Sequence, residues 1–164
     1  MAGKIAFASS FAIFATGWAF EQIRNSIAYP NLDVKVAATH AGITVGEDGS
    51  SHQALEDIAV MRALPNMHVL VPADGQATRE AVRLAIQTPG PFYLRMGREA
   101  VPLIYDADES FAVGGGKLLR PGKDATIVAC GVMVAPALTA AEQLAQEGVD
   151  VRVIGAFSVK PLDR

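Results

Sequence analysis

Residues 68–95 read HVLVPADGQATREAVRLAIQTPGPFYLR, and this stretch decides the fold class. Apolar runs at residues 68–71 and 92–95 predict two short strands. Residues 75–87 between them have the spacing of an amphipathic helix. The apolar side of that helix consists of Ala77, Ala81, Leu84 and Ala85. Two strands joined by a helix of this length predict a right-handed βαβ unit, and therefore a parallel sheet.

The same alternation continues in both directions from this unit. Further strands are predicted at residues 4–10, 34–38, 125–130 and 151–154, and further helices at 16–27, 53–64 and 134–146. The strand at residues 4–10 is expected to be buried. The pattern predicts an α/β protein with a parallel sheet and helices on both faces, followed by an incomplete βαβ unit of a second α/β domain.

We expect a first domain at residues 1–105, a linker at 106–123 and part of a second domain at 124–164. The linker interrupts the alternation with an acidic run, three consecutive glycines and Pro121-Gly122. It has room for a short hairpin.

Composition and charge exclude several classes of protein. The 164 residues are 51% hydrophobic and 19% charged, which is typical of a globular chain and not of a disordered one. The net charge of −3 comes without a basic stripe, so no nucleic-acid partner is expected. The apolar residues 5–20 are too few and too rich in Ser, Gly and Thr for a membrane span, and they lack the charged n-region and cleavage site of a secretory signal. The single cysteine, Cys130, cannot form an internal disulfide, and a cytoplasmic protein is the prediction.

Chemically interesting side chains follow three of the predicted strands. The first strand runs into Phe11 and Phe14, the second into a glycine-rich segment at residues 40–53, and the fourth into Arg95 and Arg98. In parallel sheets, ligands bind outside the carboxyl ends of the strands. The segment contributes two histidines and an acidic pair: His40, His52, Glu47 and Asp48. Together with the arginines, these residues predict a site for an anionic small molecule.

Each of these residues also has a structural interpretation. The spacing of Phe11 and Phe14 by itself favours core packing over a ring-binding surface. Asp48 lies in a good turn sequence and could bond only to local backbone. The three histidines and Cys130 lack the spacing of metal ligands, and the glycines do not form a phosphate or dinucleotide loop.

Several motifs, in their order along the chain, resemble those of transketolase. They are SFAIF at residues 10–14, ATH at 38–40, GEDGSSHQ at 46–53, RALPNM at 62–67, VPAD at 71–74, GR at 97–98 and KP at 160–161. The likeness covers essentially the whole chain and is greatest to the C-terminal subunit of split transketolases, in which two chains make one enzyme.

The resemblance implies a role for each candidate residue. The first domain would be a pyrimidine-binding domain, in which Phe11 and Phe14 pack against the aminopyrimidine ring of thiamine diphosphate. This reverses the core-packing interpretation. His40 and His52 would line the substrate channel, where they bind the sugar and transfer protons.

Two further residues would contact the sugar phosphate. Asp48 would read the configuration of a substrate hydroxyl, and Arg98 would bind the phosphate with its guanidinium fork. Arg95 receives no role and is interpreted as structural. Gly17 stands where many transketolases have a further aromatic residue, so the aromatic wall is expected to be thinner.

The resemblance also implies a partner. The family's diphosphate-binding segment, with its Mg or Ca ion, is absent from the sequence and is expected on an N-terminal subunit, in a dimer or heterotetramer. The I-A-E-like motif, whose glutamate activates the pyrimidine, is also absent. The chain is therefore expected to be truncated on both sides.

The function predicted from the resemblance is that of a transketolase component. With its partner chain, it would transfer a two-carbon ketol unit between sugar phosphates in the pentose phosphate pathway. One alternative is a catalytically incompetent fragment or binding module of the same fold. The other is a deoxyxylulose-phosphate synthase-like enzyme, against which Thr39-His40 argues. The β subunits of 2-oxoacid dehydrogenases share the fold but match the loops less well.

Overall fold

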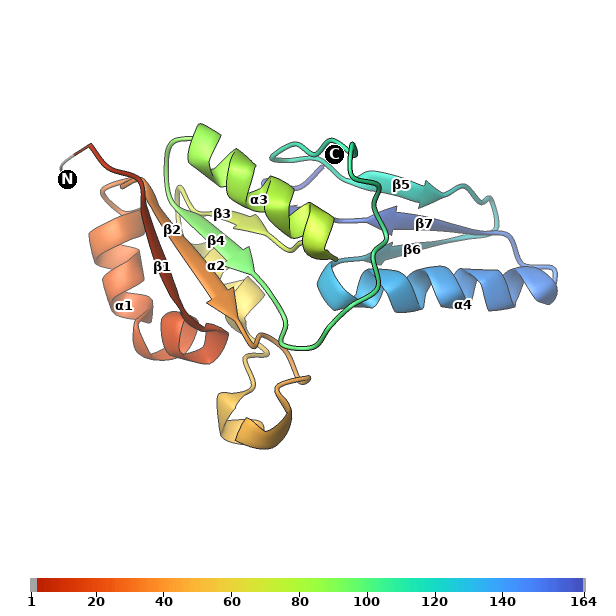
Figure 1. Cartoon of the computed structure of the whole chain (residues 1–164), viewed down its shortest axis with the longest axis horizontal. Coiled ribbons are helices and arrows are strands. Elements are labelled where there is room, and N and C mark those ends of the chain that lie inside the picture. The colour runs from red at the N-terminus through yellow and green to blue at the C-terminus, as the bar shows by residue number, and fades with distance from the viewer. Residues whose placement is uncertain (1–2, 164) are drawn as a thin grey trace.

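The computed structural model describes residues 3–163, which form two sheets. The first sheet has the order β1-β2-β4-β3-β8 and the second the order β5-β7-β6 (Figure 1). The strands of the first sheet are β1 (Ala6–Phe11), β2 (Val34–Thr39), β3 (His68–Leu70), β4 (Phe92–Arg95) and β8 (Ser158–Lys160). Those of the second are β5 (Lys117–Arg120), β6 (Ala125–Ala129) and β7 (Val151–Gly155).

Helices lie on both faces of the first sheet. The α-helices are α1 (Phe20–Ile23), α2 (Asp57–Ala63), α3 (Gly75–Gln87) and α4 (Val134–Gln146). Two π-helical turns, η1 (Phe14–Trp18) and η2 (Arg24–Ala28), flank α1. Three 3₁₀ turns are η3 (Gly46–Asp48), η4 (Ser50–His52) and η5 (Gly131–Met133). No helix within residues 3–163 is long and apolar enough to cross a membrane.

The alternation of side chains along β4 separates two cores. Phe92 and Leu94 pack with α3, α4 and the second sheet, whereas Tyr93 packs with η1, α1 and α2 on the opposite face. This arrangement confirms the predicted α/β fold with helices on both faces of a parallel sheet.

The parallel strands β1, β2, β4 and β3 end at one edge of the sheet. Phe11 at the end of β1 lies opposite Thr39 at the end of β2, and Arg95 at the end of β4 lies opposite Ala38. The βαβ unit predicted from residues 68–95 is present as β3, α3 and β4, with the two strands parallel. This register brings the candidate residues to the same edge.

The first strand, predicted to be buried, is instead an exposed edge strand. Within the described chain, β1 pairs only with β2, and its residues are exposed along almost the whole strand. Phe7, for example, keeps 43% of its surface exposed. An apolar run alone does not distinguish a central strand from an edge strand.

The helix expected at residues 16–27 is α-helical only over α1, between the turns η1 and η2. Three further elements differ from the sequence-based expectation. The helix expected from residue 53 begins at Asp57, because Ala54 instead pairs with Gly42. Residues 117–120, expected in the linker, form β5 and pair antiparallel with β7. Strand β8 returns to the first sheet and pairs antiparallel with β3. All three depend on pairing between distant segments, which a local pattern does not reveal.

Candidate functional site

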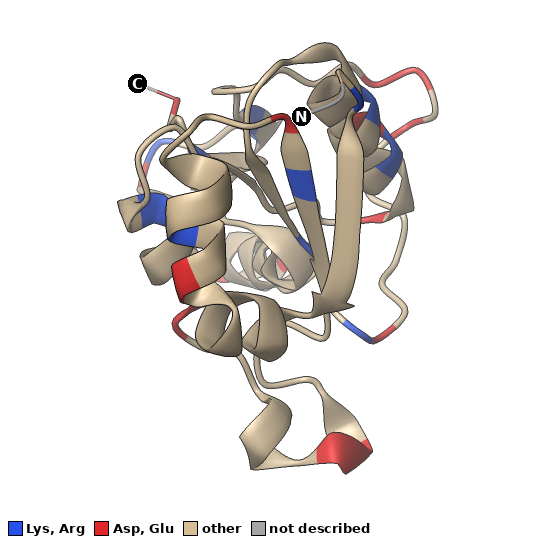
Figure 2. Ribbon diagram, turned by 90° about the vertical axis from the view of Figure 1, so that its left-hand side faces the viewer, with Lys and Arg blue, Asp and Glu red and all other residues tan. Residues whose placement is uncertain are grey.

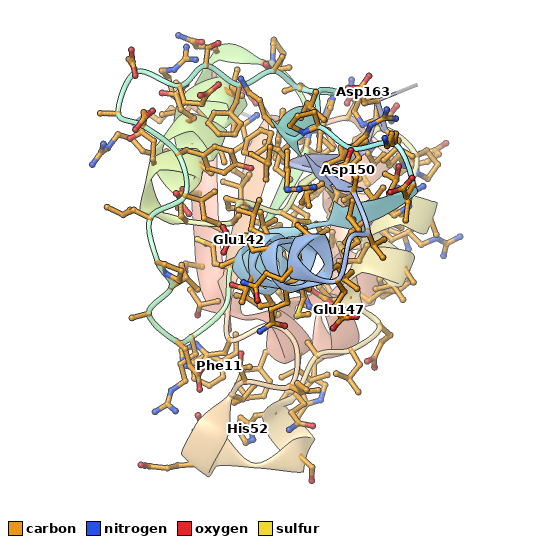
Figure 3. All side chains as sticks on the ribbon, turned by 90° about the vertical axis from the view of Figure 1, so that its right-hand side faces the viewer. Phe11, His52, Glu142, Glu147, Asp150 and Asp163 are labelled. Atoms are coloured by element: carbon orange, nitrogen blue, oxygen red, sulfur yellow. The ribbon has the colours of Figure 1, made fainter. Side chains whose placement is uncertain are left out.

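A row of aromatic and imidazole rings lies at the carboxyl ends of β1 and β2. The rings of Phe11 and His40 are stacked, with centroids 3.8 Å apart and planes within 9°. Phe14 lies parallel to Phe11 at 5.6 Å. His52 meets both phenylalanines edge-on, at 5.3 Å from Phe14 and 6.1 Å from Phe11. Figure 3 shows Phe11 beside the base of the segment that carries His52. Four of the predicted site residues therefore form one continuous cluster around Phe11.

The row continues to Trp18, which falls within the helix predicted at residues 16–27 and was not expected at the site. Its indole lies 4.9 Å from the Phe14 ring, tilted by 38°, and is 81% exposed. The turn η1 brings these two side chains to the same side, as expected for residues four apart in a helical turn. Buried Ala12 and the Thr16 hydroxyl, which donates to the Ala12 carbonyl at 2.8 Å, anchor the turn beneath them. A signal for Trp18 was present in the spacing of residues 11, 14 and 18.

His40 has an unusual backbone conformation. Its φ of 59° lies in the left-handed region, which is uncommon for a residue with a side chain. Ala41 donates to the Met96 carbonyl at 3.1 Å, and the His40 Nδ1 lies 2.9 Å from Thr39 Oγ1. These contacts fix both the turn and the ring orientation. Such conformations concentrate at functional sites.

Residues 43–53 form a loop that projects from the body of the protein (Figure 1). Its base is closed where Gly42 donates to the Ala54 carbonyl at 2.9 Å. Glu47 and Asp48 are exposed, and the loop carries a red acidic tip in Figure 2. His52 lies at the inner end of the loop, where it reaches the ring row. The structure thus joins His52 to the rings but leaves Asp48 at the tip.

The two arginines of the predicted site have different surroundings. Arg98 Nη1 donates to the Val45 carbonyl at 2.9 Å and lies under Gly46. The side chain is exposed, and its guanidinium carries further N–H donors besides this one. Arg95 instead forms an ion pair with Asp57, with Nε 2.7 Å from Oδ2. Only Arg98 is therefore placed to bind an anion from solvent.

An apolar groove of about 410 Å³ adjoins the row of rings. It runs between β1 and the turns around α1, and Phe14 forms part of its wall. Other lining residues include Ala8, Ser10, Ala15, Ala19 and Ile23. Within residues 3–163, no group of three or more His, Cys, Asp or Glu residues could hold a metal ion.

Two family models match the chain. The model of the transketolase pyrimidine-binding domain matches residues 1–103, and that of the transketolase C-terminal domain matches residues 114–164.

Curated proteins from distant organisms are similar over almost the whole chain. A putative transketolase C-terminal section of Methanocaldococcus jannaschii is 50% identical over 163 residues, which cover 98% of this chain and 52% of that protein. A 6-deoxy-6-sulfo-D-fructose transketolase subunit of a Clostridium species is 40% identical, with coverage of 98% and 50%. Human transketolase is 41% identical, with coverage of 98% and 26%. The chain thus spans about half the length of its curated relatives, or less.

Solved structures share the fold. A split-gene transketolase, described as an inactive beta4 tetramer, has a TM-score of 0.91 and 55% identity, covering 98% of this chain and 52% of that chain. Pichia stipitis transketolase in complex with sedoheptulose 7-phosphate has a TM-score of 0.84 and 32% identity, covering 94% and 23%.

Proposed function

This chain belongs to the transketolase family, and from that premise we propose that it is one component of a thiamine-diphosphate-dependent transketolase. With a partner chain, it transfers a two-carbon ketol unit between sugar phosphates. The observation that carries the proposal is the row formed by Phe11, Phe14, His40 and His52, in which two imidazoles lie against two phenyl rings.

The residues present fit the pyrimidine end of the cofactor. Phe11 and Phe14 are parallel, only partly buried and next to an apolar groove, as a surface that binds a flat ring requires. When bound, thiamine diphosphate supplies the carbanion chemistry of the ketol transfer. The two phenylalanines would hold and orient its ring, and the partner chain would hold its diphosphate and the Mg or Ca ion.

The two histidines would act on the sugar. An imidazole that titrates near neutral pH can hold or move a proton at a hydroxyl or carbonyl oxygen. Thr39 Oγ1 and the Phe11 ring fix the orientation of the His40 imidazole. Among residues 3–163, the Nε2 atom of His40 has no hydrogen-bond partner, so it is available to a substrate.

Arg98 and Asp48 would select the substrate. The guanidinium of Arg98 can bind an oxyanion through paired N–H donors, and its bond to Val45 holds it beside the loop. Asp48 would accept a hydrogen bond from a sugar hydroxyl once the site is assembled. One relative is named for a sulfosugar, so assays should include a sulfonate as well as a phosphate substrate.

We extend the proposal to the assembly and setting of the enzyme. The name of one relative as a C-terminal section, and the split-gene neighbour described as a tetramer, support an N-terminal partner subunit in a dimer or heterotetramer. The family matches to residues 1–103 and 114–164 support two domains; because β5 belongs to the second sheet, we place the start of the second domain before residue 117 and not at 124. The proposed setting is the cytoplasmic pentose phosphate pathway.

Reconstitution tests this function. The chain is combined with a partner subunit that carries the diphosphate-binding domain, and turnover of xylulose 5-phosphate plus ribose 5-phosphate is measured. His40→Ala should lower the turnover by about 10²-fold if the imidazole assists proton transfer. His68→Gln serves as the control, because His68 begins β3 at the opposite edge of the sheet. A stable complex without activity would favour the alternative of a non-catalytic binding module.

A further inference from the structure

A buried polar network lies beneath the projecting loop, and the proposed function does not use it. The carboxylate of Asp57 is fully buried. Its Oδ2 accepts hydrogen bonds from the Tyr93 hydroxyl and from Arg95 Nε, each at 2.7 Å, and its Oδ1 lies 3.3 Å from Arg95 Nη2. Burial and the Asp57 charge raise the pKa of Tyr93, so its hydroxyl stays protonated and remains a donor.

The network joins three segments that are distant in sequence. Asp57 begins α2, while Tyr93 and Arg95 are alternate residues of β4 and so lie on the same face. Arg95 Nη2 also lies under Gly42, 3.5 Å from the position that a Cβ would occupy there. Gly42 has a φ of 85°, so the turn favours glycine there, while the guanidinium lies at ordinary van der Waals distance from the position of a Cβ.

The backbone at Ala41 and Gly42, beside Arg95, connects His40 to the base of the loop. Gly42 pairs with Ala54 to close the loop, and Ala41 donates to the carbonyl of Met96, the residue after Arg95. Met96 also donates to the Ala38 carbonyl at 2.9 Å, so the backbone of His40 lies between two bonds to Met96, the residue that follows Arg95. A shift of Arg95 would move the base of the loop, and with it both imidazoles.

Stability alone does not explain this network. A buried ion pair is often no more stabilising than well-packed apolar residues of similar size, because both charges lose their hydration. The pair instead fixes the relative orientation of the two side chains, because the guanidinium fork and the carboxylate bond well in only one geometry. An apolar cluster would permit more positions of the loop base.

We propose that Asp57, Arg95 and Tyr93 are positioning residues that hold the base of the loop 43–53, and thereby keep His40 stacked on Phe11. The consequence for catalysis rests on the proposed function, whereas the consequence for the ring stacking does not.

NMR spectroscopy of the 164-residue chain tests the positioning. The chain has three histidines, whose ring-proton signals are assigned with single variants. His40 stacks on Phe11 at 3.8 Å and His68 stacks on Phe92 at 4.4 Å, so the ring currents displace both sets of signals. Arg95→Lys, which keeps the charge but loses the fork, should move the His40 signals toward the values of an unstacked histidine. The His68 signals should stay in place and report that the sheet remains folded.

A triple variant covers the case in which a single change unfolds the chain. Asp57→Leu, Tyr93→Phe and Arg95→Met together remove both charges and the hydroxyl that donates to Asp57, so no buried polar group of the network is left unpaired and the chain should remain folded. If His40 keeps its ring-current shift in this folded variant, the positioning role is wrong. If it loses the shift while His68 retains its own, the role is supported.

Kinetics in the assembled enzyme separate this proposal from the proposed function. Arg95→Lys should lower kcat by about 10-fold or more, because small misplacements of catalytic groups are costly, while the affinity for thiamine diphosphate stays within about twofold. An inactive unmodified complex contradicts the proposed function but leaves the NMR result standing. An active complex whose kcat is unchanged by Arg95→Lys contradicts the positioning role.

Discussion

The imidazole of His40 lies parallel to the phenyl ring of Phe11, with their centroids 3.8 Å apart. The contact forms because Phe11 ends β1 opposite Thr39, and His40 then turns back through a left-handed conformation. The resemblance to transketolase implies that these two residues serve the cofactor and the sugar respectively. Because the two rings stack, removing or displacing either ring takes away a packing contact of the other.

Gly46→Ala should disturb the position of Arg98. Gly46 has a φ of 77°, so alanine is strained there by about 1–3 kcal/mol, and its Cβ would also overlap Arg98 Nη1. The guanidinium must then leave its bond to Val45. We expect a lower free energy of unfolding in urea and, in the assembled enzyme, a KM for the sugar phosphate raised about 10-fold or more.

Gly49→Ala is the matched control for this change. Gly49 has a similar φ of 73°, but nothing lies within 4 Å of the position of its Cβ. It therefore carries the backbone strain without the collision. Equal losses of stability and equal KM values in the two variants would show that the contact between Gly46 and Arg98 has no importance.

Trp18 should report the binding of an aromatic ring. It is the single tryptophan of the chain, is 81% exposed and contacts Phe14 at 4.9 Å. Thiamine added to the isolated chain should quench its fluorescence in a saturable way, because a ring bound at Phe14 alters the surroundings of the indole.

Two comparisons make the fluorescence result specific. Inorganic diphosphate should cause no quenching, since it has no aromatic ring to bind beside Phe14 and Trp18. Phe14→Leu, which keeps an apolar side chain but removes the ring, should weaken the binding. Quenching that rises linearly with thiamine and is unaltered by Phe14→Leu would indicate collisions in solution instead of a site.

Much of the site could be predicted from strand ends and spacing. The side chains that follow consecutive parallel strands must meet at one edge, and Phe11, His40 and His52 do so. Asp57 could not be recognised, because a polar residue at the start of a helix is normally exposed. Only the packing of α2 against β4 shows that the Asp57 carboxylate is buried against Tyr93 and Arg95.

The edge strand and the returning strand were missed for a related reason. The residues of β1 are apolar enough for a buried strand, and their exposure follows only from the order of the sheet. Strand β8 is short and pairs with β3, far away in the sequence. Hydrophobic pattern predicts which residues form a strand, but not which strand they join.

Lys35→Met should destabilise the first sheet strongly. The side chain is fully buried, and its Nζ donates to the carbonyls of Thr88 at 3.0 Å and Gly90 at 2.7 Å while pairing with Asp33 at 2.5 Å. Methionine fills the space but leaves these acceptors without a donor. Since Asp33 is partly exposed, we expect a loss of about 2–3 kcal/mol in urea unfolding.

Lys117→Met provides the comparison for Lys35. Lys117 also pairs with a carboxylate, that of Glu109, and it lies over the ring of Phe111 as Lys35 lies over that of Phe92. Both members of this pair remain partly exposed, so water can replace the interaction. Its loss should cost less than about 1 kcal/mol. Similar losses for both lysines would show that burial does not set the strength of the Lys35 contacts.

His68 should make the stability of the chain depend on pH near neutrality. Burial lowers the pKa of His68; the Pro91 carbonyl, which bonds to Nδ1, opposes this effect, and the charges of Lys35 and Lys160 add to it. The unfolded chain, with its usual histidine pKa of about 6.5, therefore takes up a proton before the folded chain does. Stability is then lost as the pH falls below about 6.5 toward the lower pKa of the folded state. We expect Tm to fall between pH 7.5 and pH 5.5 by more in the unmodified chain than in His68→Gln, in which the other titrating groups are the same. Parallel Tm curves for the two proteins over this range would contradict the assignment.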